Sequence, residues 1–169
     1  MPSPAEPASM YVERLFAAAA PGGSLIEHDR IKVVAGAGIE GDRYFGHQDE
    51  PGQNITLIEA EEIESFLHDL GRPVDLSVTR RNVVTRGVRL NELVGREFLV
   101  GDVLLRGVEL CEPCAGLGES LASPLFPAAR VVKGFVHRAG LRADVLSGGV
   151  IARGTAIRSA HARDADVLG

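Results

Sequence analysis

Two cysteines are the most chemically distinctive feature of the chain. Both lie in the segment Leu-Cys-Glu-Pro-Cys-Ala-Gly-Leu, which spans residues 110–117. A cysteine thiolate is a strong nucleophile and a soft-metal ligand when its pKa is lowered and a partner can reach it. Cys114 follows Pro113 and precedes two small residues, which predicts a turn that presents its thiol. Cys111 follows the apolar Leu110 and fits the commoner role of a small buried hydrophobic residue.

The Cys-x-x-Cys spacing is also compatible with half of a zinc site or with a redox-active dithiol. A structural zinc ion needs two further ligands, and the sequence contains neither a second cysteine pair nor a His-x-x-x-His pattern. A thioredoxin-like dithiol would open a helix after a strand. Residues that interrupt helices follow the cysteines, at Gly116, Gly118, Pro124 and Pro127. We therefore expect no helix there and favour Cys114 as a single functional thiol.

Composition indicates a domain with a substantial core. The chain has 169 residues, of which 45% are hydrophobic, and this suffices for one sizeable core. We expect a single domain over residues 10–160. A proline-rich disordered segment at 1–9 would precede it, and a tail at 161–169 would follow it.

The net charge and the absence of targeting patterns indicate which classes of partner and which cellular compartment to expect. The formal net charge of −5 argues against nucleic acid and membrane surfaces as partners and favours small molecules. No apolar run is long enough to span a membrane, and the first residues lack the pattern of a signal peptide. Two cysteines so close together are a poor disulfide framework and fit a reducing compartment. We expect a cytoplasmic protein.

Local patterns predict one helix and many short strands. In the segment 59–70, Ile63, Phe66, Leu67 and Leu70 recur at helical spacing, and acidic residues fill the first turn. Short apolar segments bounded by glycine predict strands. These segments are 10–20, 31–34, 56–58, 83–85, 98–100, 103–105, 108–110, 131–132, 135–136, 144–146, 150–151 and 155–157, with a hairpin at 101–102. The pattern indicates a mainly β fold, an antiparallel, closed or nearly closed barrel.

The glycine-rich loop at 36–46 is a second stretch with chemical potential, because it contains Asp42 and Arg43. Its Gly-x-Gly lacks the third glycine and the long helix of a dinucleotide-binding fingerprint. Such a loop suits a close backbone approach to a ligand or a tight turn. For Asp42 and Arg43, packing within the loop and contact with a ligand are equally compatible with the sequence.

Several motifs occur in a characteristic order along the chain. They are Gly-Ile-Glu-Gly-Asp-Arg at 38–43, Arg-Arg-Asn-Val-Val at 80–84, Leu-x-Gly through Phe-x-Val-Gly-Asp at 93–102, Cys-x-Pro-Cys-x-x-Leu at 111–117, and Gly-Leu-Arg-Ala-x-Val-Leu at 140–146. In this combination the chain resembles a MOSC domain, the module named for the C-terminal domain of molybdenum-cofactor sulfurases. The resemblance covers roughly residues 11–158. It implies a β-barrel with a few peripheral helices.

The resemblance also implies roles for individual residues. Cys114 would carry sulfur as a persulfide or ligate the molybdenum of a bound molybdopterin cofactor. Arg81 and Asn82 would lie beside the pterin and phosphate of this molybdenum cofactor. A phosphate suits a guanidinium fork, and a metal that bears sulfur ligands accepts a thiolate. Further cofactor-binding candidates are Asp42, Arg43 and Arg142. Pyridoxal phosphate binding is a label attached to the family as a whole.

Two classes of function follow from the resemblance. The first is a molybdenum enzyme that reduces N-hydroxylated compounds and takes electrons from a separate flavin or iron–sulfur protein. The second is a non-catalytic module that carries sulfur on Cys114, supplied by a donor protein, or docks the cofactor for another protein. Complete reductases of the family have additional segments that this sequence lacks, a difference that favours neither class decisively. Relatives often have His after Gly-Asp-Arg, where this chain has Tyr44.

Overall fold

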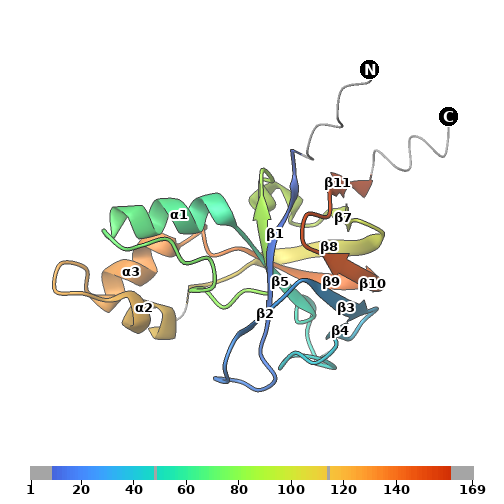
Figure 1. Cartoon of the computed structure of the whole chain (residues 1–169), viewed down its shortest axis with the longest axis horizontal. Coiled ribbons are helices and arrows are strands. Elements are labelled where there is room, and N and C mark those ends of the chain that lie inside the picture. The colour runs from blue at the N-terminus through green and yellow to red at the C-terminus, as the bar shows by residue number, and fades with distance from the viewer. Residues whose placement is uncertain (1–8, 48, 114, 161–169) are drawn as a thin grey trace.

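The computed structural model describes residues 9–47, 49–113 and 115–160 (Figure 1). The predicted tail and almost all of the segment expected to be disordered lie outside these residues. The strands are β1 (Tyr11–Ala17), β2 (Ile26–His28), β3 (Arg30–Val34), β4 (Gly38–Ile39), β5 (Ile55–Glu59), β6 (Val83–Arg86), β7 (Glu97–Val100), β8 (Val103–Leu110), β9 (Leu141–Ser147), β10 (Gly149–Ala152) and β11 (Ile157–Ser159). The helices are α1 (Ala60–Asp69), α2 (Ala115–Leu121), α3 (Ala128–Phe135) and the 3-10 helix η1 (Leu90–Leu93).

Two sheets organise the strands. The larger sheet has the order β11-β7-β8-β9-β5-β6-β1-β2, and the smaller has the order β10-β3-β4. In the larger sheet, β5 and β6 pair in parallel, whereas the other neighbouring strands that the structure describes pair antiparallel. The predicted hairpin at 101–102 joins β7 to β8, with Val100 opposite Val103. The prediction of a mainly β fold is confirmed.

The closed barrel is not confirmed, because no strand ladder in the described residues joins the two ends of the larger sheet. The strand β1 pairs with β6 along one edge, and its other edge has two different partners. Leu15 to Ala17 pair with β2, while an isolated bridge joins Tyr11 to Ala156. Backbone hydrogen bonds reinforce that bridge, including one of 2.9 Å from the N–H of Val12 to the carbonyl of Thr155. The chain near β11 therefore meets β1 without forming a continuous pairing.

Two apolar clusters occupy opposite faces of the central strands. Leu57 of β5 and Val83 of β6 belong to a cluster that the two sheets share, whereas Ile58 and Val84 belong to a cluster that the helices cover. Successive side chains of a strand point to opposite faces, so β5 and β6 are buried on both sides. Figure 1 shows the three α-helices gathered on one side, away from β3, β4 and β10.

The predicted helix at 59–70 is confirmed as α1. Its buried side chains include Ile63, Phe66 and Leu67, as the helical spacing requires, and Glu61 and Glu62 lie in its first turn. The ring of Phe66 meets that of Phe135 of α3 edge-on, with 4.2 Å between ring centroids. Burying a side chain of this size contributes about 1.5–3 kcal/mol. None of the described helices is both long and apolar enough to cross a membrane.

The other two α-helices correct the sequence analysis. The strands expected at 131–132 and 135–136 are wrong, because Val131 and Phe135 lie one helical turn apart in α3 and both are buried. The expectation that no helix follows the cysteines is also wrong, because α2 spans Ala115–Leu121. A side chain at Gly118 would lie only 2.7 Å from the carbonyl oxygen of Ala128. The glycine that argued against a helix thus allows α2 to pack closely on α3.

Candidate functional site

Three adjacent strands place a row of polar side chains on one face of the larger sheet. Thr56 of β5 lies opposite Arg142 of β9, and Arg142 in turn lies opposite Glu109 of β8. The flanking positions of β5, Ile55 and Leu57, belong to the apolar cluster between the sheets. Because side chains alternate along a strand, the polar row faces away from that core. It faces a cavity of about 350 Å³ that Thr56, Arg142 and Glu109 help to line.

Arg81 lies two residues before the start of β6 and also lines this cavity. Its Nε donates to the carbonyl of Ala139 at 3.0 Å, and one terminal nitrogen reaches the carbonyl of Glu112 at 3.4 Å. These contacts orient the guanidinium without neutralising it, since no carboxylate of the described residues forms an ion pair with Arg81. Arg81 is therefore a positive group with capacity for an anionic ligand.

Arg142 is held more firmly than Arg81 and is partly neutralised. Its Nε donates to the carbonyl of Gly52 at 3.1 Å, and Nη1 donates to Glu109 at 2.9 Å. Gly52 is fixed from the other side by Asp144, whose carboxylate accepts its N–H at 2.7 Å. A side chain at Gly52 would lie 3.2 Å from the Cβ atoms of Arg142 and Val108, and the φ of Gly52 is +84°. Glycine is therefore required where this loop crosses β8 and β9.

Cys111 lines the cavity and is buried, as the sequence predicted. Its backbone N–H donates to the carbonyl of Gly140 at 2.8 Å. Burial raises the pKa of its thiol, and the positive charges of Arg81 and Arg142 only partly oppose this effect. Cys111 is thus a neutral thiol at physiological pH. Cys114, the predicted functional thiol, lies outside the described residues.

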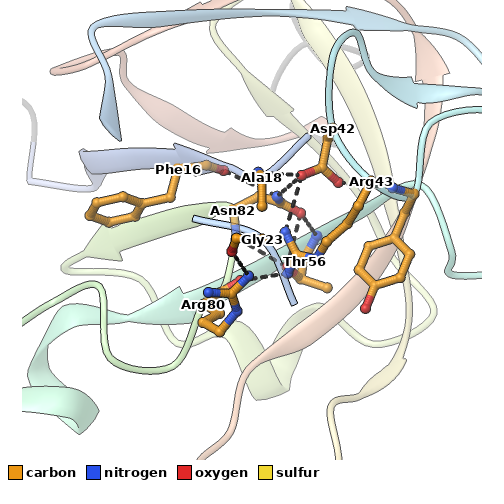
Figure 2. A network of polar contacts seen from close by, with 9 residues as sticks. Phe16, Ala18, Gly23, Asp42, Arg43, Thr56, Arg80 and Asn82 are labelled. Carbon is orange, nitrogen blue, oxygen red and sulfur yellow. Dashed lines mark hydrogen bonds and ion pairs between the residues drawn. The ribbon is translucent and has the colours of Figure 1, made fainter. Parts of the chain in front are cut away.

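Asp42 and Arg43 form a buried ion pair next to the cavity (Figure 2). Their side chains are 1% and 7% exposed, and 3.1 Å separates Oδ1 of Asp42 from Nη1 of Arg43. Asp42 also accepts the backbone N–H groups of Ala18 and Tyr44 at 3.1 and 3.2 Å. Arg43 donates to the carbonyl of Arg80 at 3.0 Å. Both residues thus pack within the protein and do not line the cavity.

Asn82 is 1% exposed and joins this ion pair to β5. Its side-chain nitrogen donates to the carbonyl of Phe16 at 3.1 Å and to Asp42 at 3.4 Å. Its side-chain oxygen accepts from the backbone N–H and the hydroxyl of Thr56. Of the five predicted cofactor-binding residues, Arg81 and Arg142 line the cavity, whereas Asn82 reaches it only through Thr56.

A family model of the MOSC domain matches residues 44–158. The chain belongs to the MOSC domain family. No curated protein matches it significantly. The YuaD protein from Bacillus subtilis has a similar fold, with a TM-score of 0.76 and 21% identity over 88% of this chain and 93% of that chain. YiiM from Geobacillus stearothermophilus aligns with a TM-score of 0.64 and 17% identity over 89% of this chain and 74% of its own. YiiM from Escherichia coli aligns with a TM-score of 0.62 and 15% identity, over 92% and 70% of the two chains.

The cavity of this MOSC domain also contains residues that the sequence analysis did not select. Tyr44 and His47 line it from the loop before β5, and the guanidinium of Arg43 lies 4.7 Å from the centroid of the Tyr44 ring. Gln53 also lines the cavity, while its side-chain oxygen is buried and has no hydrogen-bond partner among the described residues. The sequence did contain a signal for Thr56, because this residue is polar and lies between the apolar Ile55 and Leu57 at the start of the strand predicted at 56–58.

Proposed function

We propose that this MOSC domain binds a molybdenum cofactor, a molybdopterin, in the cavity beside β5 and β9. The observation that carries the proposal is Arg81, a guanidinium that faces the cavity and has no carboxylate partner in the described residues. A phosphate group would supply the missing negative charge through a charge-assisted hydrogen bond. Membership of the MOSC family supports this choice of ligand.

The residues that line the cavity fit such a ligand. The cavity volume of about 350 Å³ is in the range of small-molecule sites. Arg81 and Arg142 offer hydrogen-bond donors to an anionic group such as a phosphate. Pyridoxal phosphate fits less well, because enzymes hold it through a lysine, and neither Lys32 nor Lys133 lines the cavity.

The residues at this site would each have a defined role in binding the cofactor. Arg81 would bind the phosphate, and Arg142, braced by Glu109, would support it at the rim. Cys111 would contribute a neutral, apolar wall. Cys114 would provide the thiolate, three residues further along the sequence. When bound, the cofactor would supply a metal that exchanges electrons with a substrate.

The proposed activity is reduction of N-hydroxylated compounds in the cytoplasm, with electrons from a separate protein. The alternative is a non-catalytic role in which Cys114 carries sulfur as a persulfide or docks the cofactor for another protein. Both roles need Cys114 and the cavity, but they differ in what Cys114 holds. Metal bound to the protein supports the first role or cofactor docking, whereas cyanide-releasable sulfur without metal supports the persulfide role.

The test is to purify the protein from a host that makes the cofactor and to measure molybdenum, pterin and cyanide-releasable sulfur. We expect molybdenum and pterin in comparable amounts in the natural protein. Cys114→Ser should lose molybdenum while its unfolding transition stays unchanged. Cys111→Ala is the matched control and should keep the metal. Absence of both molybdenum and pterin from the natural protein would overturn the proposal.

A further inference from the structure

The side-chain amide of Asn82 has one possible orientation. One end of the amide faces the carbonyl oxygen of Phe16 at 3.1 Å and a carboxylate oxygen of Asp42 at 3.4 Å (Figure 2). The carbonyl can only accept a hydrogen bond, and Asp42 already accepts from Ala18, Arg43 and Tyr44. The amide nitrogen must therefore lie at this end. The oxygen of the amide must lie at the other end, toward Thr56.

This orientation decides how the hydroxyl of Thr56 is used. The hydroxyl lies 3.0 Å from the Asn82 side-chain oxygen, an atom that can only accept, so its single hydrogen points there. The backbone N–H of Asn82 donates to the same hydroxyl at 3.1 Å and occupies one lone pair. One lone pair remains. Because Thr56 lines the cavity, its hydroxyl can offer a ligand an acceptor but no donor.

Neighbouring groups in the wall of the cavity consequently differ in hydrogen-bonding character. Arg142, directly opposite Thr56 in the β5–β9 pairing, and Arg81 can only donate. Thr56, the cross-strand neighbour of Arg142, can only accept. A ligand that satisfies both the arginines and Thr56 carries an anionic group and, at another position, an N–H donor.

We propose that Thr56 selects the heterocycle of the ligand by accepting a hydrogen bond from its amino group, as on a 2-amino-4-oxopteridine. Asn82 and Asp42 are positioning residues that impose this polarity on Thr56. The inference rests on the proposed function, because it concerns the ligand of the same cavity. A 2,4-dioxopteridine presents a carbonyl oxygen in place of the amino group, and two acceptors that face each other leave both without a hydrogen.

The test compares two probes, 6-carboxypterin and 6-carboxylumazine, which share the ring and the anionic group but differ at position 2. Fluorescence titrations use full-length protein from a host that does not make the cofactor. We expect the pterin to bind roughly tenfold or more tightly than the lumazine, since a missing hydrogen bond in a buried contact changes affinity by about one decade. Thr56→Val should reduce this ratio to about 1, and Thr56→Ser should restore it.

Two further variants distinguish an effect of the hydrogen-bond direction at Thr56 from non-specific disruption of the structure. Thr79→Val is the matched control, because the hydroxyl of Thr79 is also buried but lies outside the cavity, and it should leave the ratio unchanged. Asn82→Ala frees the Thr56 hydroxyl to rotate and donate. It should lower the ratio by strengthening lumazine binding, an effect that simple structural damage would not produce. Thermal unfolding checks that each variant is folded.

The outcomes distinguish the inference from the proposed function. A ratio that stays high in folded Thr56→Val overturns the inference and leaves the proposed function intact. So does a natural protein that binds neither probe selectively but carries molybdenum and pterin when it is purified from a host that makes the cofactor. If that preparation contains no pterin either, both proposals fail.

Discussion

The buried pair of Asp42 and Arg43 and the cavity beside Arg142 are adjacent, yet they use polar groups in opposite ways. Around Asp42, donors and acceptors satisfy one another within the chain, and the ion pair is almost completely buried. In the cavity, Arg81 has no carboxylate partner among the described residues. The first region has no capacity left for a ligand, whereas the second retains it. Charged residues of the family's motifs can therefore serve either the fold or the site, depending on their partners.

The largest expected effect is on the stability of the buried region. Asp42→Ala leaves the guanidinium of Arg43 buried without its carboxylate, and such a loss costs about 3–5 kcal/mol. Denaturant unfolding measures the change. Glu40→Ala, which removes a carboxylate from the exposed pair with Lys32, is the control and should change stability by less than about 1 kcal/mol. A loss below about 1 kcal/mol for Asp42→Ala would mean that the ion pair does not stabilise the fold.

In the cavity, the same type of change should affect ligand binding and not stability. Arg81→Ala should weaken cofactor binding by about one to two decades, because a hydrogen bond to a charged group is worth about 1.5–3 kcal/mol. Cofactor content after purification and the unfolding free energy are measured together. Arg106→Ala, an exposed arginine of β8 outside the cavity, is the control. Unchanged cofactor content in Arg81→Ala would assign Arg81 a purely structural role.

The buried thiol of Cys111 in the cavity wall should make the free energy of unfolding depend on pH. Burial raises the pKa of its thiol in the folded state, so the unfolded chain releases this proton at a lower pH. The folded state then binds more protons than the unfolded state, and stability falls as the pH rises above about 8.5, by up to about 1.4 kcal/mol per pH unit. We expect the stability difference between the natural protein and Cys111→Ala to shrink between about pH 8 and pH 10. A difference that is independent of pH would contradict the buried thiol.

A small effect is expected at a partly exposed ion pair, where solvent screens the charges. Arg86 of β6 and Glu64 of α1 approach to 2.8 Å, with side chains 29% and 37% exposed. Glu64→Gln should cost about 0.2–1 kcal/mol, and the cost should decrease at high salt. Denaturant unfolding at two salt concentrations is the measurement. If Glu64→Gln cost as much stability as Asp42→Ala, burial would not determine how much an ion pair contributes in this protein.

Local sequence patterns predicted the parts of the fold whose stability is decided locally. The spacing of Ile63, Phe66 and Leu67 predicted α1, and Gly-Asp at 101–102 predicted the β7–β8 hairpin. The short helices α2 and α3 were missed for a physical reason. Helices of seven and eight residues are marginal alone, and these two depend on packing against each other at Gly118 and on the contact of Phe135 with Phe66.

The sequence by itself determined the family resemblance, the mainly β composition and the burial of Cys111, because each depends on residue type and order along the chain. Only the tertiary structure decided which polar residues share the cavity. Thr56, Arg142 and Glu109 become neighbours through strand pairings between distant segments, and the register of those pairings cannot be read from local patterns. The same holds for Asn82, which is next to Arg81 in the sequence. The backbone turns one side chain to the cavity and the other to the carboxylate of Asp42.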